Sequence, residues 1–145
     1  MPATDLLLLV TTAAHLGFQL TVTLVVYPAL AEVPAERWRA AHDAHSRRIS
    51  VAVGVVYVAW ALACVLPLVA WASGGERPAP AVLVVLASAA ATAATTAFGA
   101  APMHGRLASY DAGRVARLLA VDRARLVLGA VALAAAVVAV VVAGA

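Results

Sequence analysis

Long apolar segments alternate with short polar ones along the chain. Four segments contain no Asp, Glu, Lys or Arg: residues 6–31, 49–72, 79–103 and 126–145. An α-helix of about 20 residues crosses a hydrocarbon layer of about 30 Å. Because lipid offers no hydrogen-bond partners to the backbone, an isolated apolar segment must be helical there. The pattern therefore predicts an all-α integral membrane protein, one domain of residues 1–145 in which four spans form a bundle.

The connecting segments predict where the helices begin. Pro34 suits the first turn of a helix, and residues 35–48 run without a breaker into the second apolar segment. Residues 114–125 extend the fourth helix in the same way, with Ser109 or Asp111 as its N-cap. The second and fourth helices are therefore expected to extend beyond the membrane on the same side.

Composition and charge agree with this interpretation and suggest an orientation. The chain is 65% hydrophobic and 12% charged, with a mean hydropathy of +0.98, whereas soluble domains have about 45–50% and 25%. There is no Lys, and nine of the ten Arg lie in the connections between the first and second and between the third and fourth apolar segments. The positive-inside rule places these two connections in the cytoplasm and both termini outside the inner or plasma membrane. Arginines that flank spans without a recognition motif do not indicate nucleic-acid binding.

Three histidines fall on the side of the arginine-rich connections. His42 and His45 are three residues apart on one helix face, and His104 follows the third apolar segment. Imidazole binds Cu, Fe and Zn, and side chains from different helices of a bundle can converge on one ion. We expect these histidines to be metal ligands or acid–base groups, with Asp122 or Glu32 assisting. The alternative is that they are interfacial residues bonded to neighbours or solvent.

The first apolar segment is the most polar of the four. His15, Gln19, Thr23 and Tyr27 form a stripe at i, i+4 spacing. His15 should lie about 20 Å or more from His45 along the membrane normal, at a rise of about 1.5 Å per residue. We expect His15 to pair with Gln19 or with a threonine of the third segment. A sharper alternative makes His15 and Tyr27 cofactor-binding residues deep in the bundle, with haem less favoured than Cu, Fe or Zn.

Four short motifs follow one another along the chain. They are Gly17-Phe18 with Tyr27-Pro28-Ala29-Leu30; Trp38, His42 and Arg47-Arg48; Pro102-Met103-His104-Gly105-Arg106-Leu107; and Asp122-Arg123-Ala124-Arg125. In this order they resemble the small four-helix membrane proteins related to anthrone oxygenases. The family often has Asn where this chain has His104, and Trp and Asn where it has Val121 and Asp122. The resemblance implies oxidation of a phenolic or polyketide-like aromatic substrate by O₂.

The sequence leaves two classes of function open. One is a membrane-embedded oxidoreductase whose apolar or aromatic substrate enters from the lipid bilayer into a cavity lined by Tyr27, Thr96 and Trp60. The other is a non-enzymatic module: a subunit of a larger membrane complex, a homo-oligomer or a small carrier. The small residues of the third segment, among them Ser88 and Thr92, motivate this second hypothesis because small faces let helices associate closely in lipid.

Overall fold

The computed structural model describes residues 3–105, 107 and 109–145, so Arg106, one of the arginines used above for orientation, lies outside the described residues. The described part contains four helices long and apolar enough to cross a membrane: Ala3–Ala31, Ala35–Ala72, Pro80–His104 and Ala112–Gly144. The predicted all-α fold and its four spans are confirmed. The elements are α1 (Ala3–Thr21), η1 (Val22–Val26), α2 (Tyr27–Ala31), α3 (Ala35–Ala72), α4 (Pro80–Ala94), η2 (Thr95–Ala100), α5 (Ala101–Gly105) and α6 (Ala112–Gly144), where η denotes a π-helical turn.

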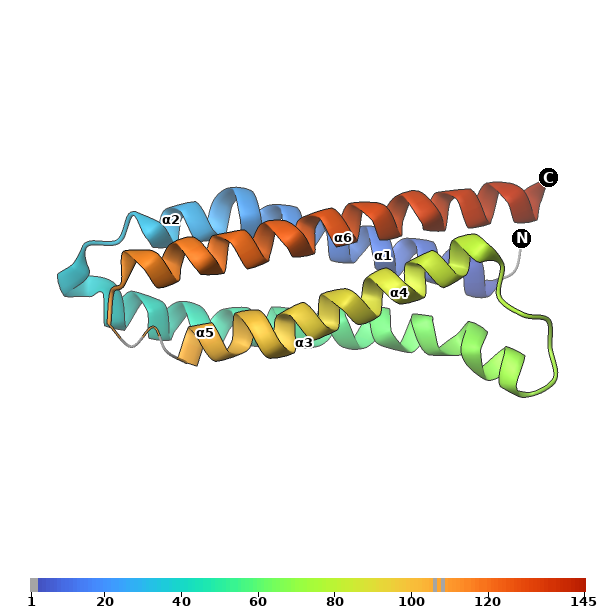
Figure 1. The fold of residues 1–145 in the computed structure, drawn as a ribbon, viewed down its shortest axis with the longest axis horizontal. Helices are drawn as coiled ribbons and strands as arrows, with labels where there is room; N and C mark the ends of the chain where they lie inside the picture. Colours follow the sequence, from blue (N-terminus) through green and yellow to red (C-terminus); the bar gives the residue numbers. More distant parts are fainter. Residues whose placement is uncertain (1–2, 106, 108) are drawn as a thin grey trace.

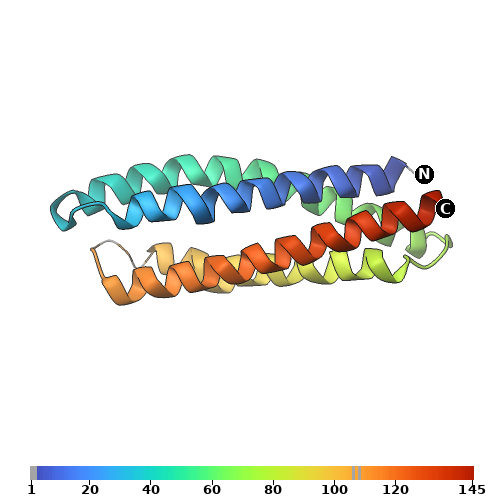
Figure 2. The same ribbon diagram turned by 90° about the horizontal axis from the view of Figure 1, so that it is seen from above.

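The helices form an up-down-up-down bundle. Both termini and the α3–α4 connection lie at one end, and the α2–α3 and α5–α6 connections lie at the other (Figure 1). Seen from above, α1 runs beside α3, and α4 runs beside α6 (Figure 2). The close packing contacts are between α1 and α3, α1 and α6, and α4 and α6, whereas α3 and α4 touch each other far less. The seam between α3 and the α4–η2–α5 helix is therefore the loosest in the bundle.

The predicted starts of the two long helices are confirmed. Pro34 immediately precedes α3, which continues unbroken from Ala35 through the apolar segment to Ala72. Asp111 is the N-cap of α6, where its Oδ1 accepts a hydrogen bond of 3.0 Å from the backbone N–H of Arg114. Both helices therefore extend beyond their apolar runs at the same end of the bundle, where the three predicted histidines also lie.

A π turn precedes a proline in each of the two remaining helices. The Tyr27 N–H donates to the carbonyl of Val22, and the Ala101 N–H donates to that of Thr96, so both bonds span five residues. The following residues, Pro28 and Pro102, have no N–H, and their rings crowd the carbonyl four residues earlier. The proline therefore opens the preceding turn, and one extra residue is accommodated there.

The interior has an apolar cluster at each end and polar side chains between them. Around the termini the buried cluster is Leu8, Trp60, Ala63, Cys64, Val82, Val85, Ala132, Ala136 and Ala139. At the opposite end it is Val22, Tyr27, Leu30, Trp38, Ala100, Leu107, Val115 and Leu118. Along each helix the residues between these clusters include the buried polar ones, among them His15, Gln19, Thr92, Asp122 and Arg125. We call this region the polar layer.

The outer surface is apolar, as a lipid-facing surface requires. Val51, Val55 and Phe98 are 70%, 67% and 85% exposed. Polar groups are therefore inside and large apolar groups outside, the opposite of a soluble domain. Ser88 and Thr92 are buried on α4, whose closest neighbour is α6. The small-residue face of this helix therefore packs inside the chain.

Candidate functional site

His104 is the centre of a polar chain built from three helices. The Tyr27 hydroxyl of α2 lies 3.1 Å from Nε2 of His104 on α5. On the other side of the ring, Nδ1 of His104 lies 3.2 Å from Nε2 of His42 on α3. The two imidazoles stack with their centroids 5.4 Å apart. The structure thus brings together His42 and His104, as the topology predicts, and adds Tyr27 to them.

One assignment of hydrogens satisfies both hydrogen bonds of this chain. If Tyr27 donates to Nε2 of His104, then Nδ1–H of His104 donates to Nε2 of His42. Nδ1 of His42 then carries a hydrogen and lies 3.9 Å from Oδ1 of Asp43, which is beyond hydrogen-bond distance, and the Asp43 side chain is 53% exposed. The chain therefore leads from a buried hydroxyl to the surface of the bundle, and we call it the Tyr27–Asp43 relay.

Trp38 fixes the position of His42. Its ring stacks on His42 at 5.6 Å, and its Nε1–H donates to the carbonyl of Leu107 at 2.9 Å. Tyr110 packs edge-on against the same indole at 5.3 Å. Trp38 is only 1% exposed. It therefore ties α3 to the connection between α5 and α6, and holds His42 against His104.

His45 lies beside the relay without joining it. Its ring centroid is 5.9 Å from that of His104 and 6.1 Å from that of Tyr27, and its buried Nε2 has no hydrogen-bond partner. The 3.2 Å between His42 and His104 nitrogens suits a direct hydrogen bond and also two ligands of one ion. Within residues 3–105, 107 and 109–145, no three His, Cys, Asp or Glu side chains are grouped to hold a metal. A metal bound by His42, His45 and His104 stays a prediction.

Asp122 belongs to the polar layer and not to the histidines. Its Oδ1 accepts from Gln19 at 2.6 Å and its Oδ2 from Thr23 at 2.5 Å, while Nη1 of Arg125 lies 3.8 Å from Oδ1. Arg125 lies on the same helix as Asp122, so this ion pair does not join two helices, whereas the bonds from Gln19 and Thr23 attach α6 to α1.

Arg125 extends this network to the other two helices. Its Nη2 donates to Oε1 of Gln19 at 3.0 Å and to the Tyr57 hydroxyl at 3.2 Å. That hydroxyl in turn lies 3.1 Å from Oγ1 of Thr96. The network therefore joins all four helices, three of them at Arg125 and the fourth through Tyr57, and Arg125 is 4% exposed. In the sequence Arg125 counts among the arginines that indicate orientation, but its place three residues after Asp122, at the edge of an apolar run, also marks it as a buried partner.

His15 does not pair with Gln19 or a threonine, so that expectation is wrong. Its ring stacks on Trp60 at 4.0 Å and meets Tyr57 edge-on at 5.1 Å. Both ring nitrogens are buried without a hydrogen-bond partner. A Cβ on Gly129 would lie 3.5 Å from Nδ1 of His15, so α6 closes over the ring. A haem beside His15 would have to displace Trp60 or α6. Tyr27, the other predicted cofactor-binding residue, contacts His104 and not His15.

A cavity of about 370 Å³ lies between the relay and the polar layer. Its walls are Phe18, Val22, Tyr27, Ser46, Ile49, Ser50, Val53, Gly54, Thr96, Ala100, Ala101, His104 and Arg125. Tyr27 and Thr96 line it as the sequence predicts. Trp60 does not belong to these walls, because it packs on His15 instead. Ser50 and Gly54 on α3 and Ala101 on α5 are exposed, so the cavity opens through the loose seam onto the apolar outer surface.

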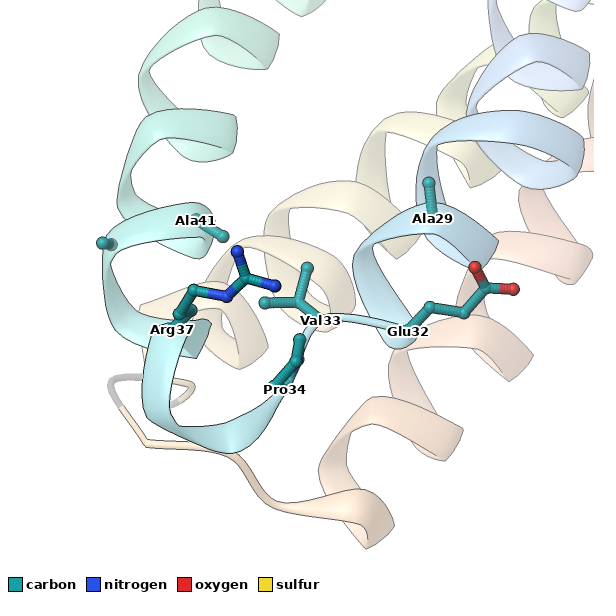
Figure 3. Close-up of a pocket in the computed structure, with 7 residues that line it drawn as sticks. Ala29, Glu32, Val33, Pro34, Arg37 and Ala41 are labelled. Atoms are coloured by element: carbon teal, nitrogen blue, oxygen red, sulfur yellow. The ribbon is translucent and has the colours of Figure 1, made fainter.

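A second hollow, of about 440 Å³, lies at the turn between α2 and α3 (Figure 3). Glu32 and Arg37 flank it with Val33 and Pro34 between them, and the Glu32 carboxylate points away from the guanidinium (Figure 3). Its lining contains no histidine. Glu32 is exposed at this hollow, so its assistance to the histidines stays a prediction.

Together, the fold and the site define a four-helix membrane bundle with a polar interior and a cavity open to its lipid-facing side. Comparison of the chain with protein-family models, curated proteins and solved structures finds no match. The resemblance to anthrone oxygenases therefore depends on the short sequence motifs alone.

Proposed function

We propose that this protein is a membrane-embedded oxidoreductase that oxidises a small hydroxyaromatic molecule taken from the bilayer. The cavity carries this proposal, because it joins an apolar entrance to Tyr27, His104 and Arg125. Concave, mostly apolar pockets with a few convergent polar groups are the usual form of small-molecule sites. The motifs shared with anthrone oxygenases supply the reaction class.

The relay supplies the acid–base part of the reaction. The substrate carries a methylene group between two aromatic rings, and its acidic proton passes to the Tyr27 oxygen as the Tyr27 hydrogen moves to Nε2 of His104. The His104 Nδ1 proton moves to His42 in the same step, and His42 releases its own proton toward Asp43. Neutral imidazoles are suited to such transfers near neutral pH.

Arg125 holds the anion that remains. Its guanidinium lines the same cavity in a buried position, where a fixed positive group stabilises developing negative charge more strongly than in water. O₂ is the oxidant: it takes up four electrons overall from the methylene carbon, and the balance is R₂CH₂ + O₂ → R₂C=O + H₂O. The inner end of the bundle, with the relay, faces the cytoplasm in this proposal.

The test is O₂ uptake by purified protein in nanodiscs with 1,8-dihydroxyanthrone as substrate, together with the absorbance of the quinone product. We expect turnover to fall by at least about 10²-fold in Tyr27→Phe and His104→Gln, the usual loss of a positioned acid–base group. Arg77→Ala, in the exposed α3–α4 turn, should keep full activity. Equal rates in all four proteins, or no uptake above the protein-free rate, would reject the proposal.

Metal content is measured on the same samples. If His42, His45 and His104 bind Cu, Fe or Zn, the wild type should carry about one ion per chain, and His42→Ala should lose it. One motive of the non-enzymatic alternative is weakened, because the small face of α4 packs within the chain. It would be favoured again by a stable hetero-complex in mild detergent together with no oxidation.

A further inference from the structure

The polar end of the cavity is electrically balanced. Arg125 and Asp122 are both buried and lie 3.8 Å apart, so their opposite charges offset each other. His104 is bonded on both ring nitrogens, to the Tyr27 hydroxyl and to Nε2 of His42, and neither bond is to a carboxylate or a guanidinium. A charged guest would add an uncompensated charge in a low-dielectric interior, which is strongly unfavourable. The molecule that enters the cavity should therefore be neutral; the anion of the proposed reaction forms only after a proton has passed from the bound substrate to the relay.

The polar groups of the cavity wall suit a guest whose ring carries both a hydrogen-bond acceptor and an exchangeable proton. Arg125 lines the cavity and presents only donors. Tyr27 and His104 can give a proton to an oxygen or take one from a hydroxyl. A guest with a carbonyl oxygen facing Arg125 and a second ring oxygen facing Tyr27 would bond to both of these side chains.

The entrance of the cavity fixes the remaining part of the guest. Ser50, Gly54 and Ala101 border it, and all three are exposed on a surface whose neighbours, such as Val51 and Val55, face lipid. A guest whose ring fills about 370 Å³ can therefore extend an apolar tail between α3 and α5 into the bilayer. Such a tail stays in its preferred solvent while the ring reaches the polar groups.

We propose that the cavity binds the headgroup of a lipid-borne quinone or its quinol, with the tail leaving through the entrance at Gly54. This inference goes beyond the proposed function, whose substrate carries a methylene group, and rests on it only for the use of this cavity as a ligand site. No oxidation step is part of the inference. The Tyr27–Asp43 relay connects the ring oxygens of the bound headgroup to the surface.

Two glycine variants test the entrance without disturbing the charged network. A Cβ on Gly54 meets no atom within 4 Å, so Gly54→Leu should fold, and its side chain should occupy the entrance. Gly17 is also an exposed helical glycine with no atom within 4 Å of an added Cβ, and it does not line the cavity. Gly17→Leu is therefore the matched control.

Decylubiquinone is titrated into each protein in phosphatidylcholine nanodiscs, with tryptophan fluorescence quenching as the readout. We expect saturable quenching in the wild type and in Gly17→Leu, and at least a tenfold weaker apparent affinity in Gly54→Leu. Empty nanodiscs and free tryptophan octyl ester give the non-saturable background. Indistinguishable curves for the two variants, or no saturable component, would overturn the inference.

A competition experiment tests neutrality. Palmitate should not displace decylubiquinone at equal concentration, and displacement that strengthens as the pH rises would overturn the inference in favour of an anionic guest. The two proposals fail separately. Quinone binding without oxidation of dihydroxyanthrone contradicts the proposed function alone, and oxidation without saturable quinone binding contradicts this inference alone.

Discussion

Substitutions of Asp122 and Arg125 should have strongly coupled effects on the free energy of unfolding. Arg125→Met leaves the buried carboxylate with its bonds from Gln19 and Thr23, so the cost should be near the lower end of the ~3–5 kcal/mol for breaking a buried ion pair. Asp122→Leu removes both short bonds and leaves a buried guanidinium, so we expect about 4 kcal/mol. The double variant buries neither charge.

The double variant should therefore be less destabilised than the two single effects combined, by a coupling energy of about 2 kcal/mol. Neutral interhelical hydrogen bonds in membranes average about 0.6 kcal/mol, so a coupling of this size reports the charges. Unfolding is followed by tryptophan fluorescence in mixed micelles of a mild detergent with increasing SDS. Arg77→Met, the same change in the exposed α3–α4 turn, serves as control. A coupling energy below about 0.5 kcal/mol would refute the reasoning, since that is the level found for independent sites.

Three further predictions use the same unfolding assay or a simple variant of it. Trp60→Phe keeps a ring but removes the Nε1–H that donates to the fully buried Thr12 hydroxyl at 2.9 Å. We expect the free energy of unfolding to fall by about 1–3 kcal/mol, and part of this loss should return on adding Thr12→Val. Gly129→Val should lose about 1–3 kcal/mol through overpacking, because its Cβ already meets α1 side chains at 3.4 and 3.5 Å, whereas Gly17→Val should not. Asp111→Ala removes the cap of α6 and should cost about 1 kcal/mol; an unchanged midpoint would show that the cap bond is replaced by water.

The spans could be predicted because they depend on one local property, the absence of charge over a membrane thickness. Cap and helix starts at Asp111 and Pro34 are likewise local, since each follows from the backbone needs of a helix end. The meeting of His42 and His104 also followed from the sequence, because an antiparallel four-helix order puts both at one end of the bundle.

Partners inside the bundle could not be predicted in the same way. The stripe through Gln19 and Thr23 was visible, but whether it faces Asp122 depends on the rotation and axial register of α1 against α6. His15 shows the same limit: its polarity predicts a hydrogen bond, whereas the structure stacks it on Trp60. Side-chain type fixes what a residue can bond, and helix register decides which residue it meets.

The prolines show a further limit. A proline inside a helix removes one hydrogen bond and commonly kinks the helix, and here the hydrogen-bond ladder widens before Pro28 into η1 and before Pro102 into η2. Which backbone hydrogen bond comes to span five residues in place of four depends on the packing of the turn as well as on the N–H that proline lacks.

The two widened turns suggest how such a site can arise in evolution. A widened turn amounts to one added codon in an ordinary helical stretch, and each residue advances the helix by about 100°. Removing one residue from the Thr95–Ala100 turn would swing His104 by that angle, away from Tyr27 and His42, while the apolar length of the helix would hardly change. A lineage could thus gain or lose this chemistry through a single-codon indel and keep the scaffold that inserts into the bilayer.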